Sequence, residues 1–426
     1  MTSIAITFTM LNALALLSLP RHWAPVPLLV GACYMTLGQE IEMGPFNFTV
    51  LRLLIAIGII RVIIRGENLN DRINSLDWLM LFWAVWALIS SFFHSDPSSA
   101  LIFRLGRVYN ALGIYFLLRI FCQSLDDVVR LCRITAILLI PVAAEMLYEK
   151  FTIHNLFSTL GGVSESPYIR EGRIRSQGPF AHSILAGTIG AVCLPLTISI
   201  WQKHRKTAIA GIIACIIMIF ASTSSGPIMS AIAAVGALWM WRFRYQMRFV
   251  LGLTIVGYVF LDLVMKAPAY YLIARLDLVG GSTGWYRVRL IESAFQHLHE
   301  WWLGGTDYTR HWMPIGATWS ENHTDITNYY LHMGILGGLP LMILFIAILF
   351  KGFSFIGRAL HSDNLPPKNQ FMIWAFGASL FAHTITFISV SYFDQSFLFI
   401  YLTLAVISST QSLSRKLQPS HSILLQ

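Results

Sequence analysis

Runs of apolar residues about as long as a bilayer is thick recur along the whole chain, separated by short polar breaks. A helix needs roughly 20 such residues to cross the hydrocarbon core, and inside lipid only helices and closed barrels satisfy their backbone hydrogen bonds. We therefore predict an all-α fold, a polytopic transmembrane helical bundle of about 12 to 13 spans. The expected spans are residues 4–19, 24–37, 48–64, 76–93, 101–121, 128–148, 179–201, 208–221, 226–241, 249–265, 326–350, 371–390 and 395–409.

The composition agrees with a membrane chain. Only 12% of the 426 residues are charged and the mean hydropathy is +0.63, whereas a soluble globular protein has about 25% charged residues. The first residues lack the basic segment of a removable signal peptide, so we expect the first spans to direct insertion. The five cysteines lie in or beside apolar runs, which suggests neither a disulfide framework nor a CxxC metal site.

The positions of Lys and Arg predict how the chain is oriented. Basic clusters lie between spans that would place them on one side, and the positive-inside rule makes that side cytoplasmic. The net charge of +9 then reflects topology, and we expect no nucleic-acid partner. Two long segments are left on the outer, periplasmic side. The expected regions are transmembrane helices in 1–148, 179–265 and 326–410, outer loops in 149–178 and 266–325, and a cytoplasmic tail in 411–426.

Both outer loops carry arginines where basic residues are usually sparse. Arg173 and Arg175 precede the span that begins near residue 179, and Arg287 and Arg289 lie in the second loop. These side chains could be solvated, since long loops can hold charge without resetting topology. Alternatively they bind an anion at the membrane surface, because guanidinium groups pair bidentately with phosphate oxygens. A diphosphate anchored by a lipid tail would lie at the membrane surface, level with these arginines.

The second loop also contains a stretch with helical periodicity. Apolar residues from Trp285 to Leu303 recur at helical spacing with polar residues between them. This pattern predicts an amphipathic helix that lies in the membrane interface or simply covers the bundle. His297, His299 and His311 lie in or after this stretch, but their spacing matches no standard metal motif. We therefore predict no metal site.

Polar residues gather where the second loop meets the next apolar run, in residues 321–325 (Glu-Asn-His-Thr-Asp). If a helix begins near His323, the eleven residues to Gly334 amount to about 20° of net rotation at roughly 100° per residue. Tyr330 and Gly337 would then share this face, and the glycines would let a neighbouring helix approach closely. The imidazole of His323 could be catalytic, or it could be a solvated or helix-capping group.

The histidine segment resembles the signature of the O-antigen ligase and polymerase superfamily. In that signature, His followed by Asn, Ser or Gln precedes nine residues and a GxxG pair. Here His323 and Thr324 precede nine residues, Gly334 and Gly337, so only Thr324 departs from the pattern. The stretches 172–182 and 284–305 resemble the first and second outer-loop segments of the family. A short Ser-Ser-Gly turn at residues 224–226 is also similar to one common in the family.

This resemblance implies a fold similar to the GT-C class and a metal-independent glycosyltransferase without a cofactor, at the periplasmic face of the bacterial inner membrane. The implied donor is an undecaprenyl-diphosphate-linked glycan, and an acceptor hydroxyl would displace the lipid diphosphate with inversion. His323 would act as base or position the acceptor. By matched position, one arginine of each loop pair would hold the diphosphate. Thr324, Tyr330, Gly334 and Gly337 would support the site.

More than one function fits the sequence. Polymerisation of repeat units, as in O-antigen or exopolysaccharide synthesis, is favoured because no acceptor domain is visible. Ligation of finished glycan to the lipid A core of lipopolysaccharide is the alternative, and either reaction could involve other polysaccharide assembly proteins. A transporter or flippase would instead place charges near the midplane, where Arg52, Arg104, Arg107 and Glu145 are candidates. We find no convincing inverted repeat, and a non-enzymatic assembly subunit stays open.

Overall fold

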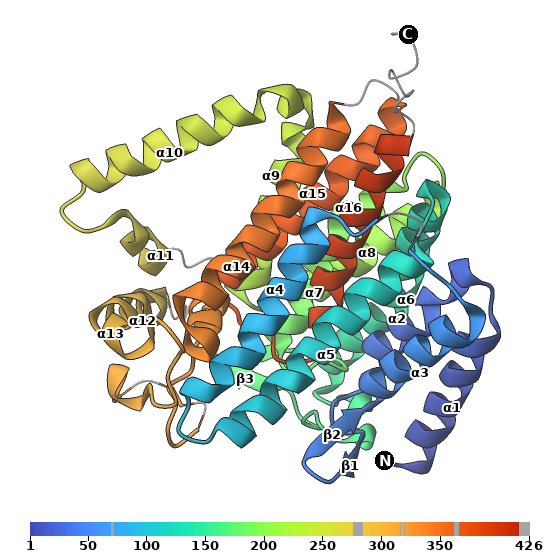
Figure 1. The fold of residues 1–426 in the computed structure, drawn as a ribbon, viewed down its shortest axis with the longest axis horizontal. Helices are drawn as coiled ribbons and strands as arrows, with labels where there is room; N and C mark the ends of the chain where they lie inside the picture. Colours follow the sequence, from blue (N-terminus) through green and yellow to red (C-terminus); the bar gives the residue numbers. More distant parts are fainter. Residues whose placement is uncertain (70–71, 276–283, 316, 319, 362–365, 417–426) are drawn as a thin grey trace.

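The computed structural model describes residues 1–69, 72–275, 284–315, 317–318, 320–361 and 366–416. Nearly all regular structure in these residues is helical (Figure 1). Five helices of the described chain are long and apolar enough to cross a membrane, judged by length and composition: Ser75–Phe93, Pro97–Phe121, Leu125–Thr152, Ser225–Val264 and Tyr329–Leu360. The prediction of an all-α chain with membrane-spanning helices is confirmed. The total of about 12 to 13 spans and the GT-C-like arrangement stay predictions.

Each apolar run that the sequence marks contains a helix. The bounds are α1 (Ser3–Ser18), α2 (Pro25–Tyr34), α3 (Val50–Arg65), α4 (Ser75–Ile89), α5 (Pro97–Phe121), α6 (Leu125–Thr152), α7 (Ser183–Ser199), α8 (Arg205–Ala221), α9 (Ser225–Trp239), α10 (Met247–Val264), α14 (Tyr329–Leu360), α15 (Pro367–Phe387) and α16 (Phe397–Lys416).

The connections between these helices hold short elements. The first loop contains η3 (Leu156–Leu160), β3 (Tyr168–Arg170) and β4 (Arg173–Arg175), and the second contains η5 (Ala269–Tyr271), α11 (Leu272–Arg275), α12 (Gly284–Gln296), α13 (Leu298–Trp301) and η6 (Arg310–Trp312). β3 and β4 form an antiparallel hairpin in which Arg170 pairs with Arg173. A second hairpin, β1 (Glu40–Met43) with β2 (Phe46–Thr49), precedes α3. The remaining 3-10 turns are η1 (Arg21–Trp23), η2 (Ser90–Phe93) and η4 (Met240–Gln246).

The core lies where the central and C-terminal helices pack against one another (Figure 1). α7 contacts α6, α8, α9 and α15, and every residue from 185 to 197 is buried. A helix enclosed on all sides is expected to be apolar all round, as this one is. Large apolar side chains such as Ile63, Phe82 and Phe220 are exposed on the outside of the bundle. An apolar outer surface is what a helix facing lipid requires.

Charges inside the bundle have local partners. Arg119 pairs with Asp77, whose other carboxylate oxygen accepts a 2.6 Å hydrogen bond from the Tyr115 hydroxyl. Arg52 donates to Asn110 Oδ1 over 3.2 Å, and Glu145 Oε1 accepts from the backbone N–H of Leu156 over 3.2 Å. Buried charges are tolerated when they are paired in this way. Glu145 is satisfied only in part, since its Oε2 is buried without a hydrogen-bond partner among the described residues.

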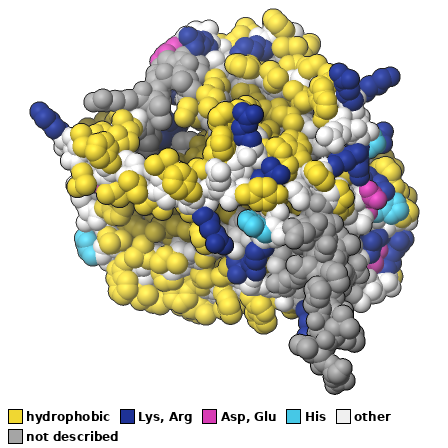
Figure 2. Space-filling model, turned by 90° about the horizontal axis from the view of Figure 1, so that it is seen from above, with side chains coloured by type: hydrophobic (Ala, Val, Ile, Leu, Met, Phe, Trp, Pro, Cys, Tyr) yellow, Lys and Arg dark blue, Asp and Glu magenta, His cyan; other side chains and the backbone are white. Residues whose placement is uncertain are grey.

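Both long loops lie at the same end of the bundle. Figure 1 places β3 and α11 to α13 at one end and the end of α16 at the other. Figure 2 views the end where α16 finishes and shows many Lys and Arg side chains there but few acidic ones. This is the end that the positive-inside rule predicts to be cytoplasmic. The loop-bearing end is the one predicted to face outward.

The run predicted as a separate span at 249–265 does not join the bundle. α10 runs away from α9 and α14 in Figure 1, and none of its residues is buried. The turn between α9 and α10 is the 3-10 segment η4, where the Arg244 guanidinium lies 4.1 Å from the centre of the Trp241 ring. By length and composition, the stretch 225–264 is a candidate for crossing a membrane, and the two separate spans expected at 226–241 and 249–265 stay a prediction.

Candidate functional site

His323 lies in a loop that precedes α14. The loop is held by a bridge between Thr318 and Thr324 and by a 3.3 Å hydrogen bond from His323 N to Ser320 O. α14 begins only at Tyr329, because Asn328 caps it by accepting a 3.0 Å hydrogen bond from Leu331 N. The prediction that a helix begins near His323 is therefore wrong, and His323 does not share a helical face with Tyr330, Gly334 and Gly337.

One ring nitrogen of His323 contacts a hydroxyl group of the protein, and the other is available to accept a proton. Nδ1 lies 3.3 Å from the hydroxyl oxygen of Thr309, and Nε2 has no hydrogen-bond partner among the described residues. The Thr309 oxygen also accepts from Thr324 N over 3.2 Å. A hydroxyl oxygen has two lone pairs, so it can accept from Nδ1–H as well. In that tautomer Nε2 is the basic nitrogen.

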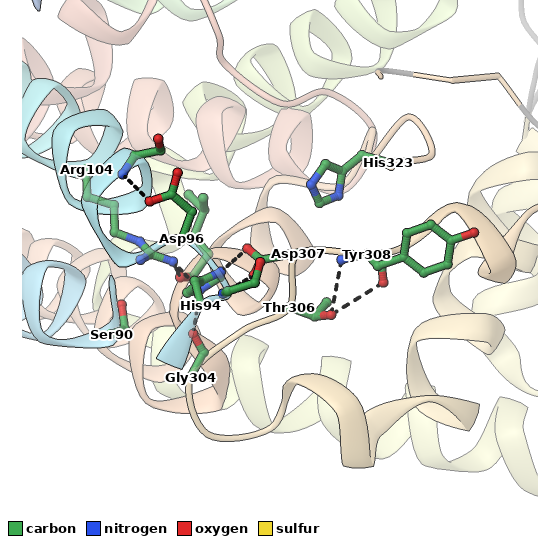
Figure 3. Close-up of polar contacts among 12 residues, drawn as sticks. Ser90, His94, Asp96, Arg104, Gly304, Thr306, Asp307, Tyr308 and His323 are labelled. Atoms are coloured by element: carbon green, nitrogen blue, oxygen red, sulfur yellow. Dashed lines mark hydrogen bonds and ion pairs between the residues drawn. The ribbon is translucent and has the colours of Figure 1, made fainter. Parts of the chain in front are cut away.

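The surroundings of His323 favour its neutral form. Burial lowers the pKa of the imidazole from the ordinary value of 6.5, and the carboxylate of Asp307 opposes this shift only in part. Figure 3 shows the His323 ring turned toward the loop that carries Asp307. A partly buried, neutral imidazole with a free nitrogen is suited to accept a proton near neutral pH.

Thr324, the position that departs from the family pattern, points into the loop. Its side chain is 0% exposed, and its hydroxyl oxygen lies 3.0 Å from Tyr286 Oη and donates to Ala317 O over 3.1 Å. Tyr286 also donates to Asp325 O over 2.8 Å. Thr324 therefore holds the His323 segment against α12 and does not face a substrate.

Tyr330 and the two glycines act in packing. The Tyr330 hydroxyl donates to Thr384 O in α15 over 3.0 Å. A Cβ on Gly334 would lie 2.5 Å from the Trp301 ring, and Gly337 O accepts a 2.7 Å hydrogen bond from Trp86 Nε1. The expected close approach at the glycines is confirmed, although the neighbours include the second loop at Trp301 as well as helix α4.

Each predicted arginine pair has one inward and one outward member. Arg175 is 6% exposed, donates to Ser224 Oγ over 2.7 Å and leaves its Nε without a partner among the described residues. The buried Nε of Arg287 is likewise unpartnered. Arg173 lies exposed near the tip of the β3–β4 hairpin. The side chain of Arg289 is 69% exposed and pairs with Glu292 at 3.4 Å.

The two inward arginines come from different loops but share one electrostatic neighbourhood. Burial lowers the pKa of Arg175 and of Arg287, and the positive charge of Arg170 adds to both shifts. Asp325 opposes the shift at Arg287, which places this arginine beside the His323 segment. Arg170 of the first loop is therefore an electrostatic neighbour of both Arg175 and Arg287.

A second polar cluster, which the sequence did not reveal as a unit, ties the bundle to the second loop. His94 pairs through Nδ1 with Asp307, and its Nε2 lies 3.0 Å from Gly304 O (Figure 3). Asp307 also accepts from Ser95 N over 2.6 Å. Burial alone would raise the pKa of Asp307, but hydrogen bonds from Ser95 and His94 hold it below its usual range. Both His94 nitrogens are engaged, so His94 positions Asp307.

Arg104 lies behind this cluster in α5. It contacts His94 and Leu336 O, it is 2% exposed, and its Nε and Nη1 have no partner among the described residues. The sequence marked Arg104 and Arg107 as candidate charges inside the membrane. It gave no sign that the partner of His94 would be a residue in the second loop.

The histidines that were predicted not to form a metal site are partly grouped. His297 and His311 lie together with Glu300, whereas His299 is outside this group.

Neither models of known protein families nor curated protein sequences match this chain. The resemblance to the O-antigen ligase and polymerase superfamily stays a prediction, and the roles of the site residues rest on chemistry and geometry.

Proposed function

We propose that the protein is a membrane glycosyltransferase that moves a glycan from an undecaprenyl-diphosphate carrier to an acceptor sugar hydroxyl. The reaction would take place at the periplasmic face of a bacterial inner membrane, and polymerisation of repeat units is the favoured form. The observation that carries the proposal is that Arg287, with a buried unpartnered Nε, lies next to the segment that bears His323, because the neighbouring Tyr286 donates a 2.8 Å hydrogen bond to Asp325 O. Arg175 of the first loop, whose Nε is also buried and unpartnered, shares Arg170 with Arg287 as an electrostatic neighbour.

The unpartnered donors of these arginines and the positive charges around them support an anionic ligand. Gathering like charges in a partly buried place is unfavourable unless an anion offsets them. The buried Nε atoms of Arg175 and Arg287 lack partners among the described residues, so both guanidinium groups keep donors for a ligand. Two phosphate groups would accept these donors in charge-assisted, bidentate geometry.

The apolar helices around the site support a lipid carrier. Residues 329–360 and 97–121 are helices long and apolar enough to cross a membrane, and both begin at the loop-bearing end of the bundle (Figure 1). A diphosphate at the level of the loops would leave its polyprenyl tail among lipid chains. The buried Arg104, with Nε and Nη1 unpartnered, lies on the same side.

The proposed step is a single displacement. The acceptor hydroxyl oxygen attacks the anomeric carbon of the donor sugar, and the bond between that carbon and the diphosphate oxygen breaks. The hydroxyl proton passes to Nε2 of His323, and the electron pair of the broken bond stays on the lipid diphosphate. Arg175 and Arg287 stabilise the negative charge that develops on this leaving group. Asp307 offsets the charge gained by His323.

A transfer assay tests the proposal. Purified protein in lipid nanodiscs is incubated with an undecaprenyl-diphosphate oligosaccharide, and the mass of the glycan is followed. Longer glycan on the carrier supports the polymerase, and glycan on added lipid A core supports transfer in the ligase form. If the wild-type protein transfers nothing under conditions in which a known glycan polymerase is active, the proposal is wrong.

A further inference from the structure

Three metal-ligating side chains converge in the second loop, away from the arginines. His297 lies at the junction of α12 and α13, Glu300 lies within α13, and His311 lies in η6. Their ligand atoms are all within 4.8 Å of one another, and His311 Nε2 lies 3.0 Å from Glu300 Oε1. Two ligands of a tetrahedral zinc ion stand roughly 3.3 Å apart. Small side-chain rotations would bring all three to that spacing.

Two of the three side chains, His297 and Glu300, also have the supporting hydrogen bond that metal ligands usually have. His297 Nδ1 lies 2.8 Å from Ser293 O, so Nδ1 carries the proton and Nε2 has the free lone pair. The second carboxylate oxygen of Glu300 accepts a 3.1 Å hydrogen bond from Trp312 Nε1. Hydrogen bonds of these two kinds fix the tautomer and the orientation of histidine and carboxylate ligands.

The rings and the charge state are also compatible with a ligand set. His297 stacks on Trp312 with ring centres 5.8 Å apart, and His311 stacks on Tyr308 at 5.1 Å. The side chain of Glu300 is 25% exposed, and the carboxyl group of a glutamate is ordinarily ionised at neutral pH, as a metal ligand must be.

We propose that His297, Glu300 and His311 bind a divalent transition-metal ion, with Zn²⁺ the best fit. Two imidazoles and one carboxylate, with the remaining position open to water, are a common ligand set for this ion. The ion would join the α12–α13 junction to η6. Thr309, which contacts His323 Nδ1, lies two residues before His311, so the ion would brace the segment that holds His323. The ion would have a structural role and would not take part in breaking the bond between the donor sugar and the diphosphate.

Metal titration of the whole protein tests this site independently of glycan transfer. Protein carrying an affinity tag without histidines is stripped with EDTA and titrated with Zn²⁺ against a chromophoric zinc indicator. We expect one Zn²⁺ per chain, a higher unfolding temperature with Zn²⁺, and visible absorption bands of tetrahedral Co²⁺ when Co²⁺ replaces it. The site is refuted if the wild-type protein takes up no stoichiometric Zn²⁺.

The key variant is His311→Ala, because this histidine is the most exposed of the three and its loss is the least harmful to folding. Its zinc affinity should fall at least about tenfold, and Zn²⁺ should no longer raise its unfolding temperature. The matched control is His154→Ala, which removes an exposed histidine 3.4 Å from Glu165 in the first loop. Equal zinc binding by the wild-type protein and His311→Ala would overturn the proposal, as would an equal loss in the control.

Discussion

The hydroxyl oxygen of Tyr286 lies 3.0 Å from that of Thr324, and this contact joins α12 to the segment that carries His323. The same phenol donates to Asp325 O over 2.8 Å. Tyr286 and Thr324 are both buried, so solvent cannot replace these hydrogen bonds. The orientation of His323 therefore depends on one side chain of α12.

Replacing Tyr286 by Phe should loosen this connection without emptying the space that the ring fills. The carbonyl of Asp325 and the hydroxyl of Thr324 lose a buried partner, which costs about 1 kcal/mol of unfolding free energy. Glycan transfer should fall severalfold because the His323 loop becomes less well ordered. Denaturant unfolding and the transfer assay measure the two effects. Tyr308→Phe is the matched control, since no hydrogen bond of the Tyr308 hydroxyl is found among the described residues, and it should change neither quantity.

Gly338 permits the second loop to pack on α14. Its φ of +73° is a left-handed value, and a Cβ there would overlap the carbonyl group of Leu303. Gly338→Ala should therefore reduce the unfolding free energy by several kcal/mol and lower the yield of folded protein. Gly357→Ala, at a helical position of α14 with open space around it, should instead be neutral or stabilise by up to about 1 kcal/mol. Thermal unfolding in detergent compares the two, and equal stability of both variants would contradict this explanation.

The sequence was sufficient to find the helices, because a long apolar run inside lipid can satisfy the hydrogen bonds of its backbone by forming a helix. It was less informative about their ends. α14 starts at Tyr329 because the Asn328 side chain caps it, whereas the apolar pattern placed the start of the span at residue 326 and the argument for a shared helical face assumed a start near His323. α10 shows the opposite difficulty, since an apolar run predicts a helix but not whether that helix packs against the others.

The site could be predicted only in part, because its geometry depends on long-range contacts. Arg287 and Arg289 are two residues apart on α12, so they must point to different sides, but the sequence does not say which side is buried. Arg173 and Arg175 point to the same side of a strand, and what separates them is that Arg175 reaches Ser224 in the turn between α8 and α9. The pair of His94 with Asp307 spans two distant segments.

The inward and outward arginines should differ sharply in their effect on transfer. Arg175→Gln and Arg287→Gln each remove a charged donor from the proposed diphosphate site, so the rate should fall about 100-fold. Arg173→Gln and Arg289→Gln change exposed side chains and should stay within about threefold of the wild-type rate. Initial rates of glycan transfer at saturating donor measure all four. A loss confined to the exposed pair would move the diphosphate site to the outer surface of the loops.

His323→Ala should reduce transfer by at least about 100-fold, the usual contribution of a general base. The protein should stay folded, because the contact from His323 Nδ1 to Thr309 is the only side-chain hydrogen bond of this histidine among the described residues. Its unfolding temperature and elution volume check this. The comparison variant Thr309→Val removes the hydroxyl that holds Nδ1, and it should slow transfer less than the loss of the imidazole does.

The dependence of transfer on pH distinguishes a base from a residue that only binds the acceptor. Burial lowers the pKa of His323 from 6.5, so the unprotonated imidazole is the main form at pH 7. The rate should be constant above pH 6.5 and fall as the pH drops through a value below it. In His323→Ala this acidic limb should be absent from the residual rate. Single-turnover rates from about pH 5 to about pH 8 test both expectations, and an unchanged acidic limb in the variant would remove His323 from the proton transfer.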